Sequence, residues 1–198
     1  MRRRTYGDAG QAFPIYITVV GGLLFLAFAY FAVGQAAANR NGAQTAADAA
    51  ALAAAQDRRE ALAGAWVQNL LDPNKWQDIF EGNAEGIDQS CWRAHSLAEK
   101  NDARVIDCTE GLLRFTVEVE TNKPVGDSIV PGTEERKSNA SATAVIDARC
   151  AFKFPAADAG EKVLPRLSCN GVHWDLKPDD PPEALPKPED LFDVHLAD

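Results

Sequence analysis

A run of 31 residues, Ala9 to Asn39, carries no charged side chain. Its apolar centre, Ile15 to Val33, is 19 residues long, which at about 1.5 Å per residue matches the roughly 30 Å hydrocarbon core of a bilayer. A core helix of a soluble domain is the alternative, but such a helix keeps a polar face. Only three side chains in the apolar centre, Ile15 to Val33, can form hydrogen bonds: Tyr16, Thr18 and Tyr30. The run therefore predicts one transmembrane helix, at residues 11–35.

The segment before the run has a net positive charge, because it contains Arg2, Arg3 and Arg4 and one acidic residue, Asp8. A cleaved secretory signal begins in the same way, but its apolar region covers only about 7 to 15 residues. We therefore expect an uncleaved anchor, with the small residues at 36–38 as the alternative cleavage point. The positive-inside bias places the basic segment, residues 1–10, in the cytoplasm. The chain is then expected to be a single-pass protein of the plasma membrane with an extracytoplasmic C-terminal part.

The exported part is acidic. The whole chain has a formal net charge of −9, and because its first 39 residues contribute +2, the remainder carries −11. Negative charge repels nucleic acid and disfavours tight docking on anionic lipid. We therefore expect the membrane and other proteins as partners, and no nucleic acid.

Residues 36–71 predict a helical segment that continues from the first, so that the two together form one continuous or once-broken helix of about 55 residues, roughly 80 Å long. Residues 36–65 contain fifteen alanines and no proline, and alanine is the best helix former. The segment 39–42 is the weak point, with two asparagines and a glycine, and Asp72-Pro73 is expected to end the helix. Because alanine lies on every side, the sequence defines no single packing stripe.

The densest part of this segment is the candidate helix-packing interface, through which we expect contact with like helices. Its residues are Ala47, Asp48, Ala50, Ala51 and Ala54. For Asp48 a solvent-facing charge is the favoured alternative to subunit contact.

Residues 72–177 predict a small extracytoplasmic α+β domain with antiparallel strands. We expect a helix at 91–100, capped by Ser90, and strands at 103–108 and 140–150. Residues 113–120 alternate apolar and polar side chains, the pattern of a half-buried strand. Residues 122–137 contain two prolines and two glycines and predict a long loop.

Four cysteines lie in this domain, and an oxidising compartment favours two disulfides. They are Cys91, Cys108, Cys150 and Cys169. A zinc site is the rival, but the spacings contain no C-x-x-C pair. If the helix after Cys91 turns back into the strand ending at Cys108, these two cysteines meet. Cys150 and Cys169 bracket a possible hairpin, 152–154 out and 163–167 back, so they form the second favoured pair among three connectivities.

Residues 178–198 are rich in proline and acidic residues and predict a disordered tail. Apolar residues near its end, Leu191, Phe192, Val194 and Leu196, offer docking on a partner as the alternative.

Catalytic motifs are missing from the sequence. It holds no nucleophile elbow, phosphate-binding glycine loop or H-E-x-x-H pattern. Its three histidines, His95, His173 and His195, are scattered and are expected to be surface or packing residues. We therefore expect no catalytic residue, no metal site, no cofactor and no enzymatic activity.

The N-terminal region resembles the TadG-like (TadE/TadG-related) family of Flp/Tad pilus assembly proteins. The resemblance covers about the first 60 residues. It rests on the basic start, the entry at Gly10-Gln11-Ala12, the apolar span, and the block at residues 44–53, which contains the "ADAAALA" pattern at 47–53. The following domain is more generally similar to pseudopilin-like proteins, in which a long N-terminal helix lies against a small sheet.

This resemblance implies a non-enzymatic accessory or minor pilin-like component of a pilus or secretion apparatus in the cell envelope. Pilins that polymerise carry a glutamate five residues after the glycine at which the leader is cut. Counted from Gly10 that position is Ile15, and counted from Gly7 it is Ala12. The missing glutamate favours an uncleaved helper over a repeating filament subunit. A membrane-anchored binding module unrelated to pili is the alternative function, and an anchored hydrolase has no motif to support it.

Overall fold

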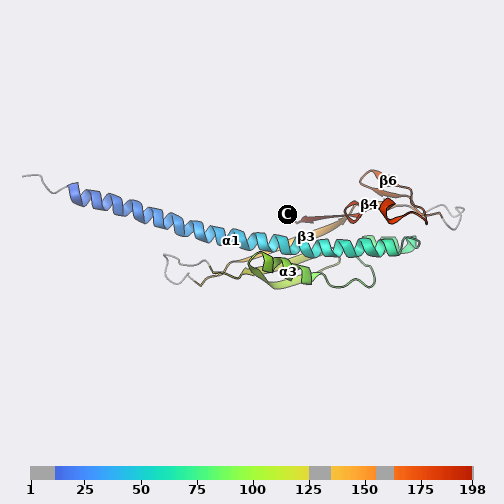
Figure 1. Ribbon diagram of the computed structural model, residues 1–198, viewed down its shortest axis with the longest axis horizontal. Coiled ribbons are helices and arrows are strands. Elements are labelled where there is room, and N and C mark those ends of the chain that lie inside the picture. Colours follow the sequence, from blue (N-terminus) through green and yellow to red (C-terminus); the bar gives the residue numbers. More distant parts are fainter. Residues whose placement is uncertain (1–11, 125–134, 155–162, 198) are drawn as a thin grey trace, which may run out of the picture.

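One long helix carries a small α+β domain along its second half (Figure 1). The computed structural model describes residues 12–124, 135–154 and 163–197, so the basic segment 1–10 lies outside the described residues. The long helix, α1, runs from Ala12 to Gln68. This arrangement confirms the predicted α+β class with a long N-terminal helix packed on a small antiparallel sheet.

α1 is continuous over 57 residues. The expected weak point at 39–42 does not interrupt it, and the Thr45 hydroxyl donates to the Asn41 carbonyl at 3.0 Å within the helix. A glycine in a helix interior costs about 1 kcal/mol, which the surrounding alanines offset. The helix ends at Gln68, a few residues before the expected stop at Asp72-Pro73. At this end the side-chain amide of Asn69 donates a hydrogen bond to the Ala65 carbonyl at 2.8 Å. Pro73 instead opens a short 3-10 turn, Pro73–Lys75.

The main sheet has four antiparallel strands in the order β1-β2-β3-β7. They are β1 (Ala103–Glu110), β2 (Arg114–Thr121), β3 (Asn139–Ala148) and β7 (Phe192–Leu196). The alternation predicted for β2 is confirmed, because Phe115, Val117 and Val119 are all buried. On the opposite face the side-chain hydroxyls of Thr116 and Thr143 form a hydrogen bond of 2.9 Å. The sheet is therefore apolar on one face and polar on the other.

The C-terminal segment corrects the sequence prediction. A disordered tail was expected at 178–198, but within its described residues the structure has helix α4 (Pro188–Leu191) followed by β7, which pairs with β3 over Ala144–Ala148. Leu191 and Phe192 are 0% exposed. The prediction of disorder followed the prolines and acidic residues upstream and overlooked a short amphipathic strand. In this strand apolar residues at 192, 194 and 196 alternate with Asp193 and His195.

A second, three-stranded sheet forms the end of the molecule far from the N-terminus (Figure 1). Its strands are β4 (Cys150–Phe152), β5 (Leu167–Cys169) and β6 (Val172–Trp174). The predicted hairpin is present, although its return strand begins at Leu167 rather than at 163. β6 is a strand that we did not predict. The dipeptide Asn170-Gly171, with φ of 48° and 84°, makes the tight turn that its sequence signals.

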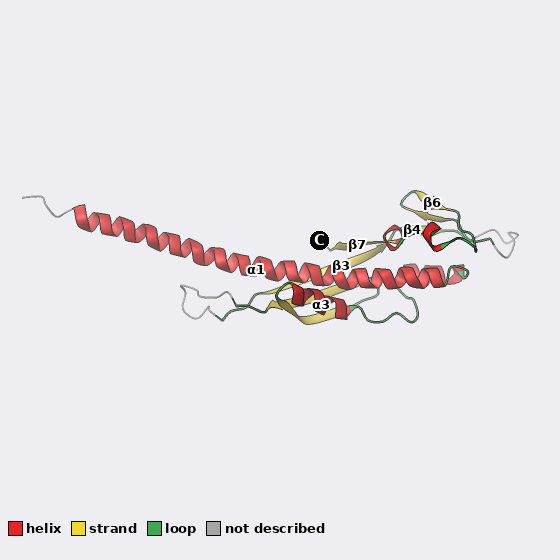
Figure 2. Ribbon diagram, in the orientation of Figure 1, coloured by secondary structure: helices red, strands yellow, loops and turns green. Residues whose placement is uncertain are grey.

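The core lies between the apolar face of the main sheet and two helices, α1 and α3 (Cys91–Lys100) (Figure 2). α3 has the predicted bounds, and Ala94 and Ala98 are its buried residues. Beyond the sheet, the short helix α2 (Trp76–Phe80) adds an aromatic cluster, in which the rings of Trp66 and Trp76 are 5.4 Å apart. α1 thus packs against three of the strands in the main sheet, β2, β3 and β7, and against the helices α2 and α3.

Candidate assembly interface

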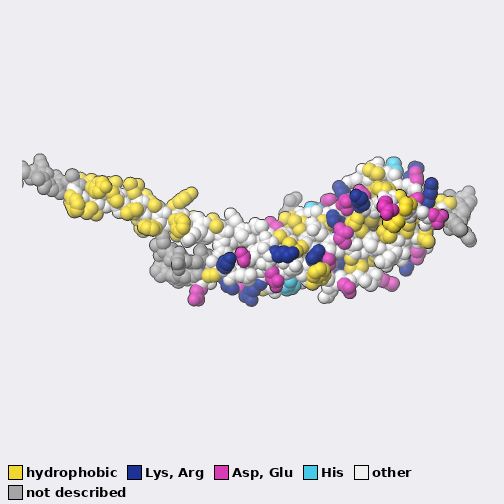
Figure 3. All heavy atoms as spheres, in the orientation of Figure 1, with side chains coloured by type: hydrophobic (Ala, Val, Ile, Leu, Met, Phe, Trp, Pro, Cys, Tyr) yellow, Lys and Arg dark blue, Asp and Glu magenta, His cyan; other side chains and the backbone are white. Residues whose placement is uncertain are grey.

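α1 has two halves with opposite surroundings. In the first, large apolar side chains point outward all around the helix, with Tyr30 84% and Val33 70% exposed, and Figure 3 shows this part as a bare apolar rod. The helix is long and apolar enough to cross a membrane. So many exposed apolar groups fit a bilayer and are unfavourable in water. This half of α1 is therefore consistent with a single-pass anchor.

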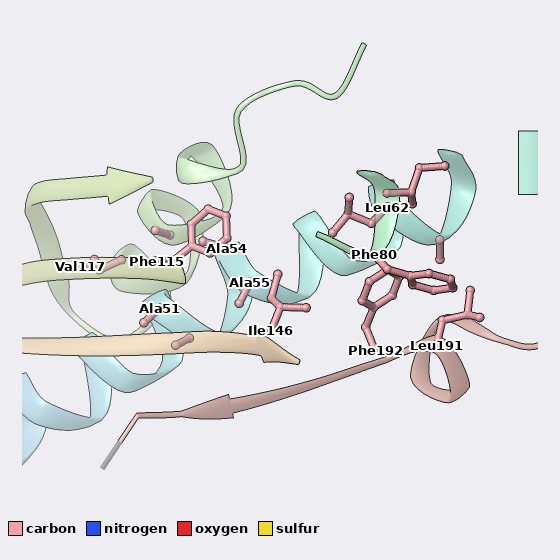
Figure 4. Packing of buried hydrophobic residues seen from close by; sticks show 14 of the residues in the cluster. Ala51, Ala54, Ala55, Leu62, Phe80, Phe115, Val117, Ile146, Leu191 and Phe192 are labelled. Carbon is pink, nitrogen blue, oxygen red and sulfur yellow. The ribbon is translucent and has the colours of Figure 1, made fainter. Parts of the chain in front are cut away.

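The second half of α1 has one buried face. Its fully buried alanines recur every three or four residues: Ala43, Ala46, Ala47, Ala50, Ala51, Ala54 and Ala55. This spacing places them on one side of the helix, and β2, β3 and β7 together with α3 pack against α1 there (Figure 4). Because alanine has the smallest apolar side chain with a Cβ, the helix and the sheet approach each other closely.

This burial shows which surface the candidate packing residues contact. Ala47, Ala50, Ala51 and Ala54 do lie at a packing surface, but the chain's own domain covers them and each is 0% exposed. The expectation that these alanines contact like helices is therefore wrong. Sequence reasoning missed the stripe because alanine also occupies the other sides of the helix. Asp48 lies at the border, half-buried, and its carboxylate accepts a hydrogen bond from the Gln44 amide at 2.8 Å.

The surface of α1 that remains open runs beside α3. A groove of about 560 Å³ separates these two helices, and Ala49, Leu52 and Ala53 of α1 and Leu97 of α3 line it together with charged residues. Arg93 and Asp57 stand 3.8 Å apart across it. This groove is a part of the alanine-rich segment that another protein can reach.

A partly buried ion pair ties α1 to the domain at the far end of the alanine stripe. Arg58 follows Ala54 on the buried face and pairs with Glu110 at the end of β1, and the two side chains are only 10% and 14% exposed. The Glu110 carboxylate also accepts the backbone N–H of Ser90 at 3.0 and 3.2 Å. Ser90 precedes α3 as predicted, but its side chain makes no capping hydrogen bond. One carboxylate thus joins α1, β1 and the start of α3.

Neither member of this pair was singled out from the sequence. One signal was available: Arg58 stands four residues after Ala54, at a position where the apolar stripe predicts another alanine. Its partner lies 52 residues further along the chain, and no local pattern indicates such a contact.

The two disulfides join the cysteines that the sequence favoured. Cys91 pairs with Cys108, which links α3 to β1, and Cys150 pairs with Cys169, which links β4 to β5. The first lies in the domain's main layer and the second in the small distal sheet. Each bridge therefore fixes a different part of a small domain.

The three histidines are separate from one another in the fold. His95 and His173 are exposed on α3 and β6, while His195 on β7 lies 3.5 Å from Asp193 and 3.9 Å from Asp147. Among the described residues, no group of three or more His, Cys, Asp or Glu side chains is arranged to hold a metal ion.

Charge pairs on the surface shift two carboxyl groups. A hydrogen bond from Arg104 lowers the pKa of Glu120, assisted by Lys137. In the distal part of the domain, a hydrogen bond from Arg166 at 2.6 Å lowers the pKa of Asp175. Both carboxylates are therefore more firmly ionised than isolated ones.

Comparison with known families bears on the first half of α1 and on the buried stripe. Residues 10–57 match the family described as putative Flp pilus-assembly TadE/G-like. The matched segment contains the apolar half of α1 and every alanine of the stripe. Comparisons with curated proteins and with solved structures gave no match. Residues 10–57 are thus similar to the TadE/G-like family of Flp pilus-assembly proteins, as the resemblance of the N-terminal region predicted.

Proposed function

We propose that the protein is a non-enzymatic, membrane-anchored accessory component of an Flp pilus assembly apparatus, with its α+β domain on the outer side of the plasma membrane. The family match at residues 10–57 associates the chain with Flp pilus assembly. The length and apolar surface of α1 support the anchor. The basic N-terminal residues 2–4 support the orientation.

The observation that carries this proposal is the double role of α1. One uninterrupted helix supplies both the apolar rod and the buried spine of the domain. A flexible tether would let the distance between the domain and the bilayer vary, whereas a continuous helix holds that distance constant. Such a rigid mount suits a protein that must present its surface to neighbouring parts of an assembly.

An accessory role fits better than that of a repeating filament subunit. At the position of the pilin glutamate counted from Gly10, the chain has Ile15, which is apolar and 64% exposed on α1. A carboxylate there would neutralise a neighbour's terminal amine within an apolar filament, and isoleucine lacks that charge. We therefore place the protein at the assembly site and not along the filament.

The groove between α1 and α3 is the surface that we assign to protein partners. It combines small apolar residues on α1 with charges of both signs on its walls, among them Arg59, Glu60 and Arg93. The alanine stripe is already covered, so self-association through the second half of α1 would use this groove.

Deletion of the gene in its native host, with complementation by variants, tests the proposal. We expect fewer assembled Flp pili in the deletion strain and restoration by the full chain. A variant in which residues 12–35 are replaced by a cleaved secretory signal should fold and be exported but fail to restore pili. Sheared pili should contain little of the protein.

Two outcomes would count against the account. Normal pilus numbers in the deletion strain would favour the alternative of an anchored binding module unrelated to pili. Stoichiometric amounts of the protein along the filament would show that it is a repeating subunit.

A further inference from the structure

The two edges of the main sheet differ in how well they are protected. The strand order places β1 at one edge and β7 at the other. β1 is irregular, because its register with β2 shifts between Val105 and Asp107, and the disulfide between Cys91 and Cys108 ties α3 to it. Bulges and covering elements are common protections of a sheet edge. The β1 edge is therefore poorly suited to pairing with another strand.

β7 has no such protection. Its residues, Phe192–Leu196, include neither lysine nor proline, and its register with β3 is regular. Figure 2 shows β7 at the margin of the sheet. An edge strand of this kind is a template for the pairing of an additional strand.

The backbone of β7 has free hydrogen-bonding groups on its outer side. In an antiparallel pair, residues alternate between bonding the partner strand and pointing away from it. The Arg149 N–H donates to the Leu191 carbonyl at 2.8 Å, so the odd-numbered residues of this segment face β3 and the even-numbered ones face outward. Within the described residues, the N–H and C=O groups of Val194 and Leu196 have no hydrogen-bond partner.

The side chains along this edge separate into an apolar and a polar side. Val194 and Leu196 are partly buried and pack against the core beside α1. On the polar side Asp193 lies directly opposite Asp147 of β3. An added strand therefore meets apolar side chains on one side and carboxylates on the other.

The polar side of the edge is acidic. The side chains of Asp193 and Asp147 are 48% and 64% exposed, and the nearest arginine, Arg149, stands 3.7 Å from Asp193. The helix that leads into β7 adds Glu189 and Asp190. Because opposite charges on neighbouring strands attract and like charges repel, this edge favours a strand with basic side chains on its polar side.

A second copy of the chain does not fit the β7 edge. β7 runs toward the membrane end of α1, because the rings of Phe192 and Phe80 are 5.6 Å apart at its start, while at its end Leu196 lines a cavity with Gln44 and Asp48. Antiparallel pairing of two β7 strands needs a two-fold axis normal to the sheet, which reverses α1 in the second copy. Parallel pairing would place apolar and polar side chains on the same side. Pairing with β1 of a second copy meets the bulged edge.

We propose that the outer edge of β7 binds an extended segment of another envelope protein, in which apolar side chains alternate with basic ones. The segment adds a fifth strand to the main sheet, continues the apolar side of Val194 and Leu196, and places a basic residue opposite Asp193. The exclusion of a second copy rests on the proposed anchoring by α1, whereas the strand addition itself is independent of a role in pilus assembly.

A synthetic peptide tests this proposal with the full chain in nanodiscs of POPC. The probe is acetyl-TVKVKVT-amide with a fluorescent label, and its control has glutamate in place of lysine. We expect saturable binding of the lysine peptide with a Kd below about 1 mM, and binding of the glutamate peptide about fivefold weaker or less. Bound lysine peptide should slow hydrogen exchange of the Val194 and Leu196 N–H groups about tenfold.

Proline variants identify the edge that binds. Val194→Pro removes an N–H that points outward and keeps the hydrogen bonds to β3, so it should abolish binding in a folded domain. The matched control is Val105→Pro at the β1 edge, where the N–H also points away from the neighbouring strand, since Asp102 and Asn122 form the hydrogen-bonded pair. This control should bind the peptide like the parent chain.

A charge reversal tests the chemistry of the segment without a change in the backbone. Asp193→Lys should weaken binding of the lysine peptide and make the glutamate peptide the tighter ligand. Failure of the lysine peptide to bind, equal binding by parent and Val194→Pro, or an unchanged preference in Asp193→Lys would overturn the proposal. Disulfide-linked dimers of Val194→Cys in nanodiscs would place a second copy on this edge and would overturn it as well. Gene deletion tests the pilus function separately, so either proposal can fail alone.

Discussion

The close approach of α1 to the sheet predicts a sharp response to one enlarged side chain. Ala51 is 0% exposed and lies on the face of α1 that the sheet covers, near Val117 (Figure 4). Leucine at this position adds three carbon atoms between two rigid backbone elements. Overpacking of this kind costs typically 1 to 3 kcal/mol, and we expect the upper end, about 3 kcal/mol, because neither element can yield locally.

The matched control is the same substitution two residues further along. Ala53 is half-buried and lines the open groove between α1 and α3, where a leucine side chain has room. We expect Ala53→Leu to change stability by less than about 0.5 kcal/mol. Both variants keep the same helix propensity, so their difference isolates packing against the sheet.

Thermal unfolding of the full chain in nanodiscs, followed by circular dichroism, measures the difference. For a domain of this size 1 kcal/mol corresponds to about 3 °C in Tm. Ala51→Leu should therefore melt about 9 °C below the parent chain, and Ala53→Leu within about 2 °C of it. Equal melting of the two variants would refute a sheet-covered alanine stripe.

Three further outcomes follow from the structure. Arg58→Met should destabilise the domain by about 3 to 5 kcal/mol in the same melting assay, because it leaves the Glu110 carboxylate partly buried without its partner, and adding Glu110→Gln should recover much of the loss. Phe192→Ala should cost about 3 to 5 kcal/mol and expose the C-terminal strand to limited proteolysis, whereas a disordered tail would make the substitution silent. Arg166→Gln should raise the pKa of Asp175 in an NMR titration, because the Arg166 hydrogen bond lowers that pKa. The stabilisation from this pair is present above the ordinary Asp pKa and is lost as the pH falls through the lowered pKa.

Local sequence patterns predicted those parts of the fold that depend on local physics. The uncharged run and the alanine-rich segment predicted one continuous or once-broken helix, and α1 is the continuous one. The alternation in β2 and the bounds of α3 were also correct. The favoured cysteine pairs follow from the helix-strand and hairpin units that contain them.

Features that depend on distant contacts were missed for identifiable reasons. Proline and acidic residues are typical of disorder, and they masked the amphipathic strand β7, which becomes stable only by pairing with β3. Uniform alanine hid the buried stripe, because only the sheet distinguishes one side of α1 from the others. The contact between Arg58 and Glu110 joins residues 52 positions apart, so it becomes visible only in the folded chain.

The central feature of this account is one uninterrupted helix that is a membrane anchor at one end and the spine of the domain at the other. The most direct test is the distance between spin labels on Ala38→Cys and Glu60→Cys, exposed sites on either side of the segment 39–42, in the full chain in nanodiscs. The chain's own cysteines are all engaged in disulfides. A continuous helix predicts a single narrow distribution near 33 Å, from 22 residues at about 1.5 Å each. A broad or clearly shorter distribution would show that the helix breaks at the membrane and that the domain is not held rigidly above it.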